Sequence, residues 1–207
     1  MGKGLALGIG LLLLGAVGSF FAGAAVLEHS RTAAEWPKQI GSATLTAVVV
    51  GFMEEILFRG AIFTALRKTW NDSAALWVSS AIYGILHFLA RPENPAQINW
   101  SSGFVVLGSM LRGFTDFQTV VPEFLSITLL GIIFALAFKR TTALYMSMGI
   151  HAGVVFGVKL FGFATNAAPD GNRWFWGTEK LVDGWFCFIL LALATIWFAR
   201  AHREEMP

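Results

Sequence analysis

Residues 40–66 read IGSATLTAVVVGFMEEILFRGAIFTAL, an apolar stretch interrupted by charged side chains. Crossing a bilayer takes about 20 predominantly apolar residues, and this stretch is longer than that. Glu54, Glu55 and Arg59 nevertheless stand near its middle. A charged side chain at mid-bilayer depth costs roughly 2.5–3.5 kcal/mol on insertion scales. Three such residues in one apolar segment therefore indicate a polar site inside the membrane.

The spacing of these charges predicts different roles for the two acids. Glu55 and Arg59 are four positions apart, so on a helix they share one face and can pair. Glu54 lies about 100° further round the helix and has no local partner. We therefore expect Arg59 to neutralise Glu55 and Glu54 to be available for catalysis.

Composition places the whole chain in the membrane class. Of its 207 residues 56% are hydrophobic and 14% are charged, against about 25% charged residues in soluble domains. Because backbone groups cannot stay unpaired in lipid, we expect an all-α bundle. We expect it to form one domain, residues 1–207, with six to seven spans. The apolar stretches are 4–27, 40–66, 74–90, 120–138, 142–163 and 181–199, with a half-length piece at 102–111 that is re-entrant, interfacial or part of a seventh span.

The net charge and the cysteine content limit the classes of partner and the disulfide bonds that we expect. The net charge is +2 with no basic stripe, so nucleic acid is not an expected partner. Cys187 is the single cysteine, which excludes an internal disulfide. We expect a multi-pass integral membrane protein in contact with lipid, in the cell membrane if the source is prokaryotic.

Two histidines fall inside the apolar stretches. Glu54 precedes the end of its stretch by 12 residues, and His87 follows the start of the next by 13. At about 1.5 Å per residue both lie roughly 18–20 Å from the connecting turn, so they can face each other. His151 is about 13 Å deep in a later stretch. Three proton-active groups can therefore meet in one pocket, or each can simply satisfy a separate hydrogen bond between helices.

These residues resemble the motifs of the CPBP family of intramembrane proteases, which includes type II CAAX prenyl endopeptidases and proteins of the Abi group. Glu54, Glu55 and Arg59 match its EExxxR motif. Tyr83 and His87 match FxxxH, with tyrosine in place of phenylalanine. The third motif is a later histidine, here His151. The resemblance covers about residues 40–163.

The resemblance implies a role for each matching residue. Glu54 corresponds to the general base that activates water, and His87 to its partner. Glu55 and Arg59 correspond to the structural pair, and His151 to a residue that helps hold the oxyanion. Peptide hydrolysis needs such an activated water and donors for the developing negative charge.

One position departs from the family pattern. The third histidine is often followed four residues later by asparagine, whereas this chain has Val155. Ser147, four residues before His151 on the same helix face, is a candidate substitute donor.

The sequence leaves open whether the site binds a metal ion. Glu54, His87 and His151 would form a two-histidine, one-carboxylate set, which is known from catalytic zinc sites. The sequence contains no HExxH motif. We favour hydrolysis without a cofactor and keep a divalent metal such as zinc as the alternative.

Three functions fit these observations. The first is an intramembrane endopeptidase acting on a membrane-associated peptide, such as a prenylated CAAX peptide or a bacteriocin leader. The second is a non-catalytic scaffold or bacteriocin-immunity protein on the same fold, which Val155 motivates. The third is a proton-coupled transporter that uses the buried glutamates, although the sequence shows no clear inverted halves.

Overall fold

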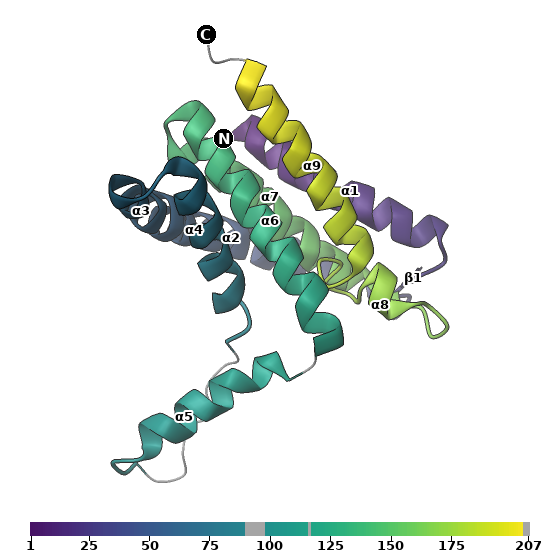
Figure 1. Ribbon diagram of the computed structural model, residues 1–207. Helices are drawn as coiled ribbons and strands as arrows, with labels where there is room; N and C mark the ends of the chain where they lie inside the picture. The colour runs from purple at the N-terminus through teal and green to yellow at the C-terminus, as the bar shows by residue number, and fades with distance from the viewer. Residues whose placement is uncertain (90–97, 116, 205–207) are drawn as a thin grey trace.

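The structure is a computed structural model that describes residues 1–89, 98–115 and 117–204. It is a bundle of helices with one pair of very short strands (Figure 1). In chain order the elements are α1 (Gly2–Phe21), β1 (Ala25–Leu27), α2 (Glu35–Glu55), η1 (Ile56–Phe63), α3 (Thr64–Thr69), α4 (Asp72–Leu86), α5 (Ser102–Met110), η2 (Leu111–Phe114), α6 (Phe117–Thr141), α7 (Leu144–Ala164), β2 (Thr165–Ala167), α8 (Arg173–Trp176) and α9 (Trp185–Glu204). The predicted all-α class is confirmed.

Four helical segments are long and apolar enough to cross a membrane: Gly2–Phe21, Glu35–Thr69, Phe117–Thr141 and Leu144–Ala164. The chain is therefore a multi-pass integral membrane protein. The expected six to seven full spans are not found in the described part of the chain. Helix α4 has only 15 residues, about 22 Å of rise, which is short of the roughly 30 Å hydrocarbon core. The apolar part of α9, Trp185–Arg200, is likewise too short.

The segment Glu35–Thr69 is one continuous helical rod that changes its winding in the middle. It is α-helical over α2, π-helical over η1 and α-helical again over α3. The Thr64 hydroxyl, at the C-terminal end of the π-helical segment, donates to the Arg59 carbonyl oxygen at 2.8 Å. π-helical turns occur frequently at functional sites, and this one begins directly after Glu55.

Helices α6 and α7 run side by side through the middle of the bundle (Figure 1). Helices α1 and α2 pack on α7, while α4 and α9 pack on α6. The α1–α7 contact depends on glycine. A Cβ on Gly153 would lie 2.5 Å from the Leu5 carbonyl oxygen, and one on Gly4 would lie 2.5 Å from the Met146 carbonyl oxygen. Small residues allow this close approach of backbones, as is usual between membrane helices.

The glycine contacts also orient His151. Gly149 and Gly153 share one face of α7 and meet α1. His151 lies two positions from each, about 200° round the helix, so its side chain points to the opposite side of α7. Packing of α1 on the glycine face thus directs the imidazole toward α2 and α6.

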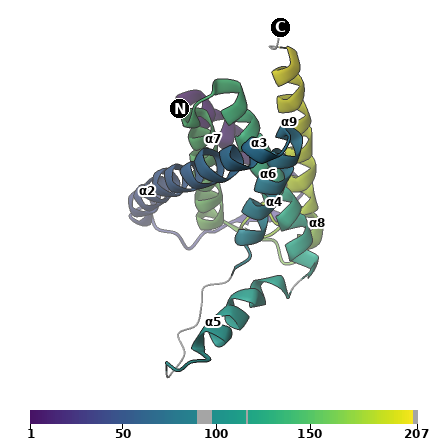
Figure 2. The same ribbon diagram turned by 60° about the vertical axis from the view of Figure 1, so that its left-hand side comes forward.

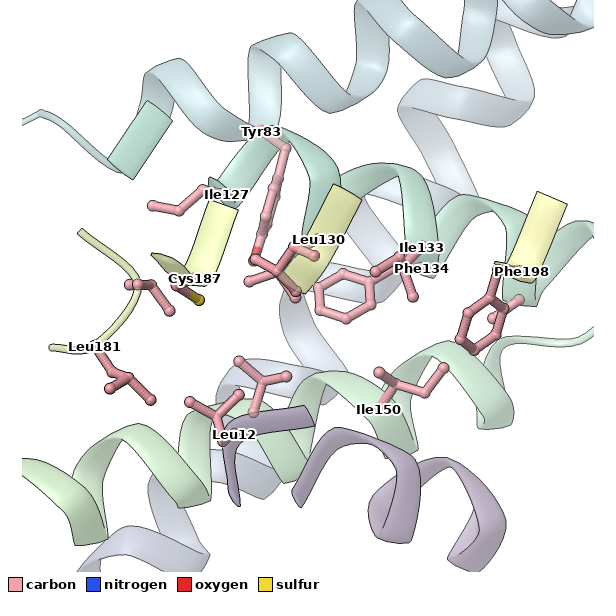
Figure 3. Close-up of a cluster of buried hydrophobic side chains, with 14 of the residues drawn as sticks. Leu12, Tyr83, Ile127, Leu130, Ile133, Phe134, Ile150, Leu181, Cys187 and Phe198 are labelled. Atoms are coloured by element: carbon pink, nitrogen blue, oxygen red, sulfur yellow. The ribbon is translucent and has the colours of Figure 1, made fainter. Parts of the chain in front are cut away.

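The hydrophobic core fills the space between α1, α4, α6, α7 and α9. Figure 3 shows Tyr83 reaching from α4 to the side chains of Leu130 and Phe134, with Ile150 and Leu12 below. Phe134 and Ile150 are fully buried. Outside the core many large apolar side chains are exposed, as expected for surfaces that face lipid.

Helix α5 stands apart from the bundle in both views (Figures 1 and 2). It covers the half-length piece predicted at 102–111, and its nine residues confirm that this piece is not a span by itself. Its apolar side chains Phe104, Val105 and Leu107 are exposed.

Candidate active site

Glu55 and Arg59 form the predicted ion pair inside the bundle. Arg59 Nη1 donates to Glu55 Oε1 at 2.8 Å, and both side chains are almost completely buried. Arg59 Nη2 donates to the Gly131 carbonyl oxygen of α6 at 2.9 Å. The guanidinium also lies over the rings of Tyr83 and Phe134, at 4.7 and 5.0 Å from their centroids. These contacts compensate the cost of burying the cation.

Glu55 has a second partner that its sequence context does not reveal. Its Oε1 atom lies 3.0 Å from Nδ1 of His151. Glu55 therefore ties α7 to α2 while it neutralises Arg59. The other side of the imidazole stacks on Phe134, with ring centroids 4.7 Å apart and planes 14° from parallel. The carboxylate and the aromatic ring together hold His151 in one orientation.

Glu54 points to a different environment from Glu55. Its side chain is 31% exposed, whereas that of Glu55 is fully buried. Glu54 Oε2 lies 3.8 Å from Nε2 of His151 and 3.9 Å from Nε2 of His87. This oxygen is buried and has no hydrogen-bond partner among the described residues. The three side chains predicted to meet are thus brought together around one point.

The position of His87 differs from the expected one. The sequence predicts it inside a span over 74–90, but α4 ends at Leu86 and His87 is its C-cap residue. Residue 90, the expected end of that span, lies outside the described residues. The histidine is still held in place, because its Nδ1 atom lies 2.8 Å from the Tyr83 carbonyl oxygen, one of the last carbonyls of the helix.

The hydrogen bonds determine which nitrogen of each histidine carries the proton. Ionised Glu55 and the Tyr83 carbonyl can only accept, so Nδ1 of His151 and Nδ1 of His87 donate to them. In their neutral forms both rings then present the Nε2 lone pair toward Glu54. The Tyr83 hydroxyl lies 3.3 Å from Nε2 of His151 and is the donor in that contact as long as the ring is neutral.

Tyr83 belongs to this site although the sequence motifs predict no catalytic role for it. In the sequence it is only the tyrosine that replaces phenylalanine in the FxxxH motif. The structure places its ring against Arg59, His87 and His151 at once. The signal in the sequence was its position four residues before His87, on the same helix face.

A cavity of about 300 Å³ opens on this site. Tyr83, His87 and His151 are among its lining residues, and most of the other lining side chains are apolar residues of α6 and α7. The volume is at the lower end of the range typical of ligand-binding pockets.

Val155 lines the same cavity, so the position expected to carry asparagine does face the site. Ser147 does not substitute for it. Its side chain is fully buried, its hydroxyl donates to the Leu144 carbonyl oxygen at 3.0 Å, and it is not part of the cavity wall. The hydroxyl group that the structure does place beside His151 belongs to Tyr83.

Glu54, His87 and His151 are the residues that would hold a metal ion. Across residues 1–89, 98–115 and 117–204, no three His, Cys, Asp or Glu side chains are grouped so that they could bind one. The described side chains therefore do not fit a metal centre. The distances of 3.8 and 3.9 Å from Glu54 to the two imidazoles are too long for direct hydrogen bonds.

Comparison with known proteins gives the family. No curated protein and no solved structure matches the chain significantly. The family model described as Type II CAAX prenyl endopeptidase Rce1-like matches residues 36–157, which are more than half of the chain and include every side chain placed around Glu54. By this match over its central helices, the chain belongs to the Rce1-like family of type II CAAX prenyl endopeptidases.

Proposed function

We propose that this protein is an intramembrane endopeptidase that hydrolyses a peptide bond in a membrane-associated peptide, using a water activated by Glu54. The observation that carries the proposal is the position of Glu54 Oε2. It is buried, it lacks a direct hydrogen-bond partner among the described residues, and it lies 3.8–3.9 Å from two imidazole nitrogens. That spacing suits a water bound between base and imidazoles. Family membership supports the same reaction class.

The proposed reaction begins with the water between Glu54 and His87. Glu54 takes one proton as the water oxygen attacks the scissile carbonyl carbon, while Nε2 of His87 accepts a hydrogen bond from the remaining O–H and so orients the attacking oxygen. The tetrahedral intermediate then collapses with cleavage of the C–N bond. Glu54 returns its proton to the leaving amine, so that one water yields one carboxyl group and one amine.

The negative charge on the former carbonyl oxygen needs donors. We propose that the Tyr83 hydroxyl supplies one donor, and that His151 supplies the other in its imidazolium form, with Nε2 protonated as well as Nδ1. Tyr83 in this reading replaces the donor that Val155 does not provide. Glu55 and Arg59 do not touch the substrate, and they act by positioning His151.

The test is cleavage of a quenched fluorescent peptide library by purified protein in detergent or lipid, with Glu54→Gln as the matched inactive variant. We expect cleavage by the wild type, none by Glu54→Gln, and no effect of a chelator. Cleavage by a folded Glu54→Gln variant would overturn the proposal. Loss of activity on chelation that returns with zinc would replace the metal-free mechanism by a metal-dependent one.

A second candidate is a non-catalytic scaffold or immunity protein on the same fold. The observation that favours it is Val155, which lines the cavity where the family pattern often has a polar donor. The two candidate functions can be distinguished by measuring the protein's biological effect in cells. A scaffold keeps that effect in the Glu54→Gln variant, whereas a protease loses it.

A further inference from the structure

One end of the bundle is strongly basic. The start of α1, the connection between α6 and α7 and the second half of α9 lie together at this end (Figure 1), and an ion pair between Lys139 and Asp72 at 2.7 Å ties the start of α4 to it. The basic residues there are Lys3, Arg67, Lys68, Lys139, Arg140 and Arg200. Asp72 is the one acidic residue at this end whose side chain the structure describes, and it is shared between Arg67 and Lys139. The described side chains therefore leave an excess of positive charge.

The opposite end of the bundle carries charges of both signs. In the connection between α1 and α2, Glu28 and Glu35 alternate with Arg31 and Lys38, and acidic and basic residues are also mixed in the connection between α7 and α9. Under the positive-inside rule, the end with the excess of lysine and arginine faces the cytoplasm. The cytoplasmic leaflet contains anionic lipids, which basic side chains near the membrane surface attract.

A cavity of about 710 Å³ opens at the basic end, between the start of α1, the α6–α7 connection and α9. Lys3 and Arg140 are among its lining residues, and no acidic residue is among the lining residues that the structure describes. Most of the other lining side chains are apolar or aromatic. The cavity shares no lining residue with the one that opens on the candidate active site. It is therefore a separate site, suited by its charge to an anion.

The lining changes from charged to apolar with depth. Leu7 lies one helical turn after Lys3 on α1, about 6 Å further into the bundle. Tyr145 and Trp197 line the cavity and are 52% and 56% exposed, which is typical of aromatic residues at the boundary between lipid and water. Phe198, by contrast, is buried. A cationic rim above an apolar wall fits a molecule with an anionic head and a hydrocarbon tail.

We propose that this cavity binds an anionic phospholipid of the cytoplasmic leaflet. Its phosphate lies at Lys3 and Arg140, and the beginning of its acyl chains lies against Leu7, Trp197 and Phe198. Such a lipid contacts α1, α6, α7 and α9 at once, and because it binds only where these helices are assembled, it stabilises the folded bundle. The site is independent of the proposed hydrolysis, so its test requires no cleavage.

The experiment titrates purified protein in a neutral detergent with phosphatidylglycerol or with phosphatidylcholine of the same acyl chains. Native mass spectrometry gives the affinity of each lipid, and thermal unfolding gives its effect on stability. Lys3→Gln and Arg140→Gln each remove one charge from the cavity rim, whereas Ala6→Phe fills the cavity without changing the charge. Two exposed lysines outside the cavity serve as controls: Lys68→Gln at the same basic end and Lys38→Gln at the opposite end.

We expect wild-type protein to bind phosphatidylglycerol about 10-fold or more tightly than phosphatidylcholine. Lys3→Gln and Arg140→Gln should each weaken phosphatidylglycerol binding about fivefold, which corresponds to about 1 kcal/mol for each basic residue near a membrane surface. Ala6→Phe should weaken it as well, and both lysine controls should leave it unchanged. The rise in unfolding temperature caused by phosphatidylglycerol should become smaller in the same three variants.

Three results would overturn the lipid site. The first is equal affinity of the wild-type protein for the two lipids. The second is a loss of binding in Lys68→Gln as large as that in Lys3→Gln, which would assign the attraction to the general charge of this end. The third is competition by glycerol 3-phosphate at the concentrations at which phosphatidylglycerol binds, because that compound has the phosphate but no acyl chain and would make this a site for a soluble anion.

Discussion

Glu55 and His151 lie 96 positions apart in the chain, and yet Oε1 of Glu55 is 3.0 Å from Nδ1 of His151. The same oxygen accepts from Arg59 at 2.8 Å. One buried carboxylate therefore neutralises a cation and orients an imidazole. This double role explains why two adjacent acids in one helix are not equivalent.

The first prediction concerns that difference. Glu55→Gln leaves Arg59 without its counter-charge in the bundle interior and weakens the hold on His151. Removing one partner of a buried pair typically costs about 3–5 kcal/mol. We expect low expression and a clearly lower unfolding temperature in detergent, whereas Glu54→Gln stays folded and loses activity. A stable, active Glu55→Gln protein together with an unfolded Glu54→Gln protein would reverse the two assignments.

His87 is predicted to affect rate more than substrate binding. Its Nε2 atom faces Glu54 and its Nδ1 atom is anchored to the Tyr83 carbonyl oxygen. His87→Ala should lower kcat about 100-fold or more, the range for acid–base groups, with a smaller change in KM. His29→Ala, at an exposed histidine, is the control. Steady-state kinetics that show full activity for His87→Ala would exclude the proposed dyad.

Tyr83→Phe removes one hydroxyl and keeps the ring that packs on Arg59 and Phe134. We expect stability to change by about 1 kcal/mol, the value of one hydrogen bond. The value of kcat should fall about 100- to 1,000-fold if the hydroxyl stabilises the oxyanion. Circular dichroism and single-turnover cleavage separate the two effects. A drop in melting temperature without a drop in the rate of the folded fraction would assign Tyr83 to structure alone.

Position 155 offers the complementary test. Because Val155 lines the cavity, Val155→Asn should raise kcat and should partly restore the activity of Tyr83→Phe. Ser147→Ala should leave kcat unchanged, since the Ser147 hydroxyl is engaged with the Leu144 carbonyl oxygen outside the cavity. A double-mutant cycle on the cleavage rate measures the coupling. Additive effects of the changes at 83 and 155 would show that the two positions do not serve the same oxyanion.

The contact between α1 and α7 should be sensitive to one methyl group. Gly153→Ala places a Cβ 2.5 Å from the Leu5 carbonyl oxygen, so the helices must separate. We expect a lower unfolding temperature and reduced activity, because α7 carries His151. Gly10→Ala is the matched control, since nothing lies within 4 Å of its added Cβ. Equal melting temperatures for the two variants would contradict the role assigned to the glycine face.

Relationships within one helix or one hairpin were predictable from the sequence. The helical period alone places Arg59 on the face of Glu55 and turns Glu54 away from both. The short connection between α3 and α4 puts Glu54 and His87 at similar depth, and the described distance of 3.9 Å agrees with that arithmetic. Apolar composition alone dictated a helical membrane bundle, because lipid leaves backbone groups no partner other than their own helix.

Only the tertiary structure decided how the helices are rotated toward one another. The bond from Glu55 to His151, the stacking of His151 on Phe134 and the approach of the Tyr83 hydroxyl all join helices that are distant in sequence. Helical periodicity tells which residues share a face, but not which helix that face meets. That choice depends on the packing of glycine faces and aromatic rings across the whole bundle, which no local pattern records.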